Sequence, residues 1–470
     1  MRARRVGLVS GTPQSDYPPP ELRLELDVSV CRHSEGSVLL GGSPLRMLRL
    51  AAPGVDLLNR WLAGAPVGTT PAARGLARRL LDIGLVHPRR APGLHTTADV
   101  TLVVPVKDNA VGVAWLLAAT TDLYQRIVVD DGSTPPLAAA TLRHHVPHGP
   151  AAARNTGFRQ AKTDLIAFID SDVEPDPGWL ASILPLFDDP AVAAVAPRVR
   201  GSAVSRQSRG IGAELADYEV DRSSLDMGPH CGVVRPMTRI GYVPTAALVV
   251  RRAALIAIGG FDEKLRFGED VDLVWRLVDS GWLVRYQPDA VVRHQPRETL
   301  RAWLRQRFDY GTSAAPLALR HPGRLTCARL NGWSALSWGL VVAGRPGAAL
   351  GTGAVSTALA YRALRRHSLP AVAAVSVAGQ GHLAAGQMLA AAVRRTWWPV
   401  ALLTRAGRRA VLFSMLNVLA EAVAGRRGAR WTLLRIADDV AYSAGVWAGC
   451  RRHRTLAPLL PRIITSTPPQ

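Results

Sequence analysis

Pairs of acidic residues stand at three places in this 470-residue chain, two of them where an apolar run ends. In LIAFIDSDVEPDPGW, two aspartates separated by one residue follow a strand-like run, with a proline turn behind them. Carboxylates in this arrangement can hold a divalent cation, accept a proton or bind sugar hydroxyl groups. Turn chemistry also places Asp at strand ends, so a single pair decides nothing. The three pairs are Asp130 with Asp131, Asp170 with Asp172, and Glu269 with Asp270.

Other candidate residues lie close to these pairs in the sequence. VVPVKDN ends another apolar run with an acid, and AAARNTGF carries a basic and an amide side chain before a glycine. A glycine after the first acidic pair lets the backbone turn tightly against a ligand. A histidine after the last strand-like run is either a metal ligand or a packing residue. These candidates are Pro105, Val106, Asp108, Gly132, Arg154, Asn155 and His294.

The elements that must position these residues alternate between strand and helix from residue 100 to 310. Such alternation predicts an α/β domain with a mostly parallel sheet covered by helices, and with ligands at the carboxyl ends of the strands. The acidic pairs stand at these ends or open a helix. The expected strands are VTLVVPV, RIVVDDG, DLIAFID, VAAVAP, AALVV and LVRYQP, and the expected helices include residues 110–119, 179–187 and 270–278.

Four of these segments, in this order, resemble the nucleotide-sugar motifs of family 2 glycosyltransferases: VPVKDN, VVDDGST, ARNTG and FIDSDVEPDPGWL. FGEDVDL resembles the catalytic acidic motif of the same family. The resemblance covers residues 99–312 and implies a GT-A, Rossmann-like fold for a catalytic domain that we place at 96–320.

The resemblance also implies an inverting enzyme and a role for each residue. Asp172 would bind Mg²⁺ or Mn²⁺, which neutralises the leaving diphosphate. Asp170 would lie at the ribose or at metal-bound water, and His294 would be a further metal ligand. Asp270 would be the general base, with Glu269 beside it in the first turn of a helix. The nucleotide sugar would contact Pro105, Val106, Asp108, Asp130, Asp131, Gly132, Arg154, Asn155 and Asp170.

A small module precedes the catalytic domain, over residues 1–95. Residues 22–30 alternate apolar and polar as a half-buried strand does, and SVLLGG (37–42) is expected to pair with them as a hairpin. Helices are expected over 45–62 and 71–82. VLLGG, LLNRWLAGAPV and LLDIGLV resemble PqqD-like peptide-recognition domains, which implies a winged-helix-like α+β fold and a peptide-derived acceptor. The alternative is an extension that only packs on the next domain.

The tail, residues 321–470, combines apolar runs with arginine clusters. From Arg320 to Arg454 there are 19 Arg and no Lys against three acids, so 19 − 3 gives +16 of the chain's formal +21. Such charge fits nucleic acid or an anionic membrane, and the apolar runs favour the membrane. We expect interfacial α-helices at the cytoplasmic face of the cell membrane, against the alternatives of spanning helices and a soluble bundle. A nucleic-acid partner is not expected, because the catalytic half lacks aromatic residues interleaved with Lys and Arg.

The amino-terminal half is expected in the cytosol. MRARRVGLVSG is basic but lacks the apolar stretch of a signal peptide. The four cysteines are far apart and form no C-x-x-C, which suits a reducing compartment.

The order of the three parts resembles the glycosyltransferases of the mycofactocin system. The resemblance implies UDP-glucose as donor, a peptide-derived redox cofactor as acceptor, and a β-1,4-linked oligoglucoside as product. Two alternatives stay open: a membrane glycosyltransferase that makes a glycolipid or an envelope polysaccharide, and a non-catalytic peptide carrier. The presence of all three acidic pairs disfavours the carrier.

Overall fold

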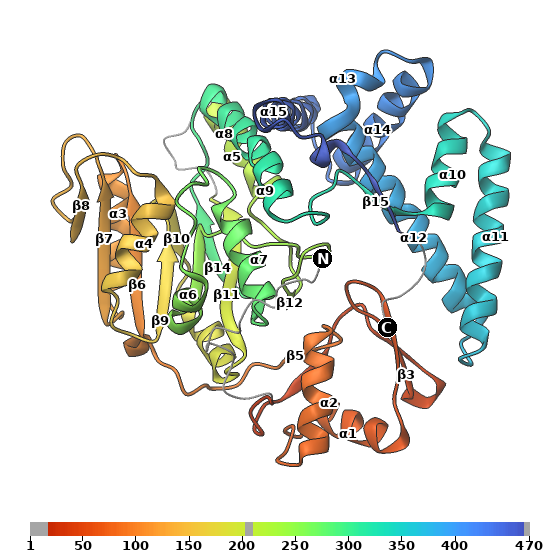
Figure 1. Ribbon diagram of the computed structural model, residues 1–470, viewed down its shortest axis with the longest axis horizontal. Helices are drawn as coiled ribbons and strands as arrows, with labels where there is room; N and C mark the ends of the chain where they lie inside the picture. Colours follow the sequence, from red (N-terminus) through yellow and green to blue (C-terminus); the bar gives the residue numbers. More distant parts are fainter. Residues whose placement is uncertain (1–16, 203–209, 465–470) are drawn as a thin grey trace, which may run out of the picture. The chain divides into compact units, whose positions relative to one another are not determined.

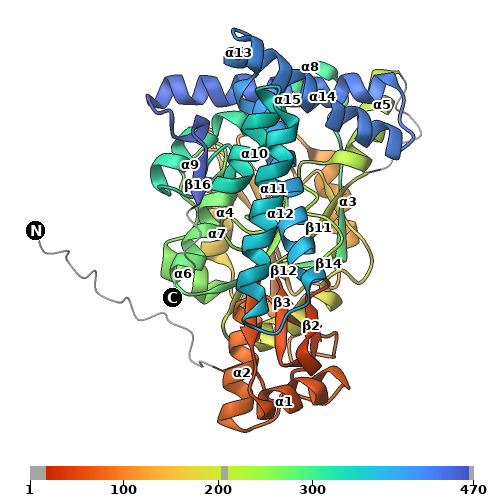
Figure 2. The same cartoon turned by 90° about the vertical axis from the view of Figure 1, so that its right-hand side faces the viewer.

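The computed structural model describes residues 17–202 and 210–464. These residues form two compact units, one of residues 17–202 with 219–296 and the other of residues 210–218 with 297–464. Figure 1 and Figure 2 draw both units, coloured along the sequence.

The first unit begins with a small α+β part that has its own apolar core, in which Leu24, Leu39, Leu58 and Trp61 are buried. Its two helices each carry proline in their first turn, where the missing N–H costs nothing. The elements are β1 (Leu24–Leu26), β2 (Cys31–His33), β3 (Val38–Gly41), β4 (Arg46–Arg49), α1 (Ala52–Leu62), α2 (Pro71–Asp82) and β5 (Val86–Pro88).

Two expectations for this part are wrong. The strand expected within 22–30 pairs with β5, whereas β3, which lies in SVLLGG, pairs with β2 and β4. The helix expected over 45–62 begins at Ala52, because Arg46–Arg49 pairs with β3 as a strand. The helix over 71–82 forms as expected. Alternating polarity predicts that a strand exists, but its partner depends on contacts distant in sequence.

The rest of the first unit is built on a nine-stranded sheet in the order β10-β14-β11-β13-β9-β6-β7-β8, with β12 paired to β14. Its strands are β6 (Val100–Val106), β7 (Gln125–Asp131), β8 (Leu142–His144), β9 (Leu165–Ile169), β10 (Val173–Pro175), β11 (Val192–Gly201), β12 (Gly232–Val233), β13 (Ala247–Arg251) and β14 (Leu283–His294). The helices that accompany them are α3 (Ala110–Ala119), α4 (Pro150–Gln160), α6 (Arg252–Ile258) and α7 (Glu269–Asp279).

The sheet is mixed rather than mostly parallel. β6, β7, β8, β9, β11 and β14 run in one direction, and β10, β12 and β13 run in the other. β13 follows the long connection 202–246 and enters between β9 and β11 from the opposite end. The six strands that share a direction still bring their carboxyl ends to one edge, where ligands bind in open α/β sheets.

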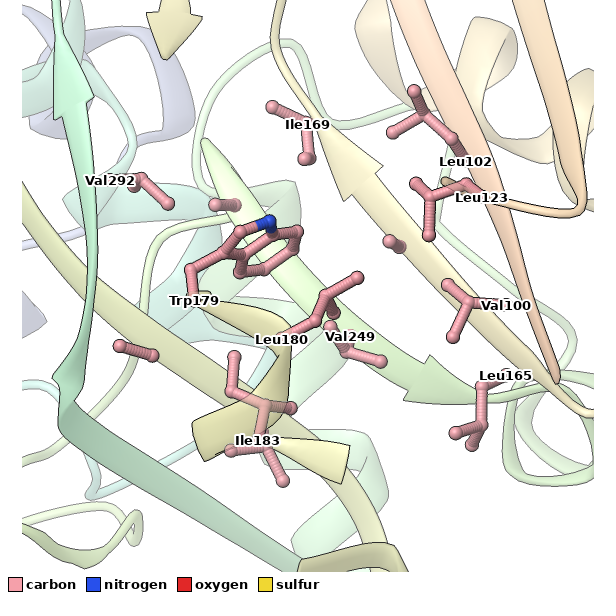
Figure 3. Close-up of a cluster of buried hydrophobic side chains, with 14 of the residues drawn as sticks. Val100, Leu102, Leu123, Leu165, Ile169, Trp179, Leu180, Ile183, Val249 and Val292 are labelled. Atoms are coloured by element: carbon pink, nitrogen blue, oxygen red, sulfur yellow. The ribbon is translucent and has the colours of Figure 1, made fainter. Parts of the chain in front are cut away.

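The core beneath this edge is apolar and closely packed. Figure 3 shows Trp179, Leu180 and Ile183 beside the strand residues Ile169 and Val249, all within one buried cluster. The helix expected over 179–187 is instead two short 3₁₀ helices, Leu180–Ser182 and Leu184–Asp188. Pro185 explains the interruption, since it has no N–H for an α-helical ladder. This core fixes the strand that precedes the Asp170–Asp172 pair.

The second unit is helical, as expected for the tail. Its elements are α8 (Leu300–Thr312), α9 (Ala314–Arg320), β15 (Arg329–Asn331), α10 (Gly332–Val342), α11 (Pro346–Arg365), α12 (Ala371–Ala392), α13 (Trp398–Ala401), α14 (Arg405–Ala424), α15 (Ala429–His453) and β16 (Arg462–Ile464). α5 (Ile211–Arg222) belongs in part to each unit. Among the helices within the described ranges, none combines the length and apolar character that crossing a bilayer demands.

Candidate active site

Three loops are tied together at the carboxyl edge of the sheet. Ser133 Oγ accepts the backbone N–H of Asp108 at 2.8 Å, and Asp108 Oδ1 accepts that of Thr134 at 2.9 Å. Asn109 Nδ2 donates to the carbonyl and hydroxyl oxygens of Ser171, both at 3.1 Å. The loops after β6, β7 and β9 are therefore fixed relative to one another, and three of the expected donor-binding motifs share one site.

The end of β6 forms the base of this site. Pro105 and Val106 are buried, whereas Asp108 is exposed and has a left-handed backbone with φ of 55°. Asn109 then caps α3 by accepting the backbone N–H of Gly112 at 3.0 Å. The chain thus turns sharply from strand to helix beside the exposed carboxylate.

The two aspartates that end β7 accept hydrogen bonds from the segments that follow the strand. Asp130 is fully buried and accepts the backbone N–H of Ser133 at 2.8 Å and a guanidinium N–H of Arg143 at 2.6 Å. Burial alone would raise the pKa of Asp130, but these bonds hold it below its ordinary value. Asp131 accepts the backbone N–H groups of His148 and Gly149, both at 2.8 Å. Both carboxylates shape the loop, and their contact with a nucleotide stays a prediction.

The backbone conformation at position 132, between these aspartates and Ser133, requires a glycine. Its φ is 77°, and a Cβ there would lie 2.9 Å from the Pro147 ring. Only glycine adopts this conformation without strain. A substitution at 132 would displace the loop that holds Asp108.

Arg154 joins two of the acidic motifs. Its Nη2 donates to Asp170 Oδ1 at 2.7 Å and its Nη1 to Glu269 Oε1 at 3.0 Å, while the guanidinium lies 5.5 Å from the centroid of the Phe261 ring. The side chain is only 3% exposed. Burial alone would lower the pKa of Arg154, but the two carboxylates hold it above its ordinary value. We call Arg154, Asp170 and Glu269 the arginine clamp.

Asn155 holds the segment that leads to the second half of the clamp. Its Nδ2 donates to Phe261 O at 2.9 Å and to Glu263 Oε1 at 2.8 Å, and its Oδ1 accepts the Phe261 N–H at 2.9 Å. Gly260 lies directly against it with φ of 74°, where a Cβ would be 2.6 Å from Asn155 Oδ1. The structure therefore gives Asn155 a positioning role.

Glu269 and Asp270 open α7, as the sequence predicted. Glu269 is buried against Arg154, and Asp270 is half-buried beside it. Burial, together with the negative charge of Glu269, raises the pKa of Asp270 to about 7. A carboxyl with such a pKa is suited to accept a proton near neutral pH.

Asp172 and His294 lie close to each other, and both act electrostatically on Asp170 of the clamp. His294 ends β14 and Asp172 immediately precedes β10, which pairs with it, so Asp172 Oδ2 and His294 Nε2 are 3.5 Å apart. Within the described ranges, three or more His, Cys, Asp or Glu side chains nowhere gather closely enough to enclose a metal ion. Asp172 and His294 fit a cation that takes its other ligands from a diphosphate and water, which is how Mg²⁺ is commonly bound.

The sequence did not single out several residues that hold the site together. These are Asn109, Ser133, Ser171 and Phe261. Ser133 and Ser171 stand inside the quoted motifs, and Asn109 stands at a helix start, so their types gave a usable signal. Phe261 gave none, because its contact with Arg154 joins segments more than one hundred residues apart.

Comparison with known proteins gives two strong matches. The family model of glycosyl transferase family 2 matches residues 111–252. Pre-mycofactocin glycosyltransferases of two strains of Mycobacterium tuberculosis are 39% identical over 476 aligned positions, which cover 95% of this chain and 99% of each relative.

More distant relatives match parts of the chain. Probable glycosyltransferase YdaM of Bacillus subtilis is 24% identical over 244 residues, covering 47% of this chain and 56% of that protein. Among solved structures, mannosyltransferase PcManGT of Pyrobaculum calidifontis, in complex with GDP-mannose and Mn²⁺, is 18% identical with a TM-score of 0.39, covering 77% of this chain and 89% of that one. That likeness is too distant to support a statement about this chain.

Proposed function

The chain is a glycosyltransferase that belongs to the pre-mycofactocin glycosyltransferases of family 2, and we propose that it transfers a hexose to the peptide-derived mycofactocin precursor. We propose glucose from UDP-glucose as the donor and a β-1,4-linked oligoglucoside as the product. The identity over almost the whole length of the relatives supports the acceptor class. The sugar and the linkage rest on the resemblance alone.

One observation carries the proposal: the arginine clamp brings Asp170 and Glu269 to one site. Asp172 follows Asp170 by two residues, and Asp270 follows Glu269 by one. Arg154 therefore joins the pair suited to the donor and its cation to the pair that contains the proposed base. A transferase that inverts configuration needs the leaving group and the base on opposite faces of the sugar.

Asp270 is proposed as the general base. Its raised pKa lets it take the proton of an acceptor hydroxyl group as that oxygen attacks the anomeric carbon. Arg154 positions it indirectly, by fixing Glu269 in the first turn of α7. Direct attack from the side opposite the phosphate converts an α-linked donor into a β-glycoside.

Asp172 and His294 are proposed to hold a divalent cation, with Asp170 at the ribose or at metal-bound water. The cation would supply Lewis-acid stabilisation of the leaving diphosphate. The 3.5 Å approach of the carboxylate and imidazole supports this assignment. Pro105, Val106, Asp108 and Gly132 would line the nucleotide side.

We propose that the α+β part at residues 17–95 recognises the peptide-derived acceptor, as PqqD-like domains recognise peptides. Its core is separate from the large sheet. Arg78 of α2 donates to Asp189 at 2.8 Å and 3.1 Å, and Arg239 donates to Asp27 at 3.2 Å. These ion pairs support a module docked on the catalytic sheet rather than one on a loose tether.

The cytoplasmic face of the cell membrane is our proposed location. Support comes from the arginine excess of the tail and from its many exposed apolar side chains.

The test is mass spectrometry of the products formed by purified full-length protein with Mn²⁺ or Mg²⁺. A panel of UDP- and GDP-sugars is offered to the peptide-derived precursor and, separately, to a polyprenyl phosphate. The proposal predicts a ladder of hexose masses on the precursor with UDP-glucose. Transfer to the lipid alone would contradict it and favour an envelope glycosyltransferase.

A further inference from the structure

One face of α14 exposes a row of large apolar side chains. Leu412, Leu416, Leu419 and Val423 recur at intervals of three and four residues, so they lie on one side of the helix, with Phe413 beside them. Their exposed fractions are 68%, 57%, 51%, 78% and, for Phe413, 47%. A single exposed leucine is ordinary, but five such residues on one helix face form a patch that marks an interaction surface.

The opposite face of α14 is anchored by a polar network. Ser414, Val418 and Ala422 are buried there. The carbonyl oxygen of Ser414 accepts from Arg394 Nη1 at 2.7 Å, and Arg394 Nε donates to Asp439 at 2.8 Å. Rolling the helix to bury its leucines would break the hydrogen bond between Arg394 and Ser414 and leave a buried guanidinium N–H without its acceptor, which is unfavourable. The apolar face is therefore held outward.

Further large apolar side chains are exposed just before the helix. Val400 in α13 is 52% exposed, and Leu402 and Leu403, between α13 and α14, are 43% and 77% exposed. Figure 1 draws α13 and α14 next to each other, in blue. Exposed apolar side chains are thus not confined to α14.

Arginines flank this surface at both ends. Arg405, Arg408 and Arg409 are exposed at the start of α14, and Arg426 and Arg427 are exposed just after its end. From residue 400 to 437 the sequence has a single acid, Glu421, whose Oε2 lies 3.5 Å from Arg435 Nε. No carboxylate therefore stands among the exposed leucines.

We propose that the face formed by Leu412, Phe413, Leu416, Leu419 and Val423 inserts into the interfacial layer of an anionic bilayer. The helix axis would lie along the membrane plane, with the flanking arginines among the lipid phosphates. A second copy of the chain fits less well, because antiparallel pairing of two such faces would bring arginine clusters together. The inference rests on the membrane location proposed above and is independent of the proposed reaction.

The test is flotation of the full-length protein with vesicles of phosphatidylcholine alone or mixed with phosphatidylglycerol. The wild type should bind the mixed vesicles, and less so at high salt, because salt screens the arginines. The double variant Leu412→Glu with Leu416→Glu should lose at least tenfold in binding. The matched control is Leu94→Glu, at a leucine 86% exposed in the first unit, and it should bind like wild type.

A second variant keeps the test valid if the glutamates disturb folding. Arg405→Gln with Arg409→Gln leaves the apolar face intact and should weaken binding to the anionic vesicles alone. Unchanged binding of both double variants, or no binding by wild type, would overturn the inference. A dimer that light scattering detects in wild type and not in Leu412→Glu with Leu416→Glu, with vesicle binding unchanged, would assign the face to a second copy instead. Transfer to a soluble acceptor, measured on the same samples, reports the proposed reaction separately.

Discussion

Two arginine–carboxylate clusters in this molecule have opposite composition. Around Arg154, two carboxylates, those of Asp170 and Glu269, pair with one guanidinium group, and the carboxyl group of Asp270 lies within its electrostatic influence. Around Asp439, three guanidinium groups share one carboxylate at 2.8 Å, 3.6 Å and 2.7 Å, those of Arg394, Arg395 and Arg435. Carboxylates outnumber guanidinium groups in the first cluster, and guanidinium groups outnumber carboxylates in the second.

The pKa directions follow from this difference. Burial, and then Glu269, raises the pKa of Asp270 to about 7, and burial raises that of Asp170. Burial alone would also raise the pKa of Asp439, but Arg435 and Arg395 hold it below its ordinary value. An acid-rich cluster is ready to take up a cation or a proton, which suits catalysis. An arginine-rich cluster is neutralised within the protein and holds helices together.

The largest expected effect is on transfer by Asp270→Asn. Loss of the base should lower kcat by about 10²–10⁴-fold, while the dissociation constant of the donor stays unchanged. Single-turnover assays and calorimetric donor titration measure the two quantities. The control is Asp279→Asn, at the far end of the same helix, which should transfer normally. Loss of donor binding in Asp270→Asn would show that this residue has a structural role. The contrast between a catalytic cluster and a structural cluster would then fail.

The two clusters should respond to charge removal with opposite signs of stability. Asp439→Asn removes the carboxylate that pairs with the buried guanidinium groups of Arg394 and Arg435 and should cost about 3–5 kcal/mol of unfolding free energy. Asp270→Asn removes an under-neutralised charge and should stabilise the protein by about 1 kcal/mol at pH 8. Urea unfolding at pH 8 compares them. Equal destabilisation by both variants would contradict the account.

The sign of the pH effect on stability differs in the same way. The pKa of Asp439 is lower in the folded state than in the unfolded state. Its ionised form therefore stabilises the folded protein above the unfolded pKa, and this stabilisation is lost as pH falls through the folded pKa. The pKa of Asp270 is raised, so its ionisation disfavours the folded state as pH rises from about 4 toward about 7.

His294→Gln should weaken activation by Mn²⁺ about tenfold, since an imidazole that binds or orients the cation would be lost. The half-saturating Mn²⁺ concentration for transfer measures this. The matched control is His230→Gln, at a histidine outside the site. An unchanged Mn²⁺ requirement would make His294 a packing residue.

The smallest expected effect is on the pH profile. With a base of pKa about 7, kcat/KM should fall about tenfold per pH unit below that value. Arg154 lowers the pKa of Asp270, so Arg154→Met should shift the profile to higher pH. An unchanged pH profile in Arg154→Met would show that the clamp has a structural role and no electrostatic effect on Asp270.

The sequence predicted the strands and helices that carry the site more reliably than it predicted the contacts between their side chains. β6, β7, β9 and α7 form where apolar runs and helical spacing predicted them. The partner of β1 and the direction of β13 were not predictable, because pairing joins segments distant in sequence.

The chemical roles were also predicted unevenly. Asp170 and Glu269 were expected at one site and the structure joins them through Arg154, whereas Asp130 and Asp131 accept hydrogen bonds from the segments that follow β7. Residue type shows that a carboxylate is present. Which hydrogen bonds it accepts depends on how loops fold back, as when His148 and Gly149 reach Asp131.

The anomeric configuration of the product tests the central claim most directly. The account makes Asp270 a general base for direct displacement of the diphosphate, which inverts the configuration at the anomeric carbon. ¹H NMR of the freshly formed product from an α-linked sugar nucleotide should therefore show a β-glycoside. An α-glycoside would contradict the account, because retention requires the acceptor to attack from the face that the diphosphate leaves.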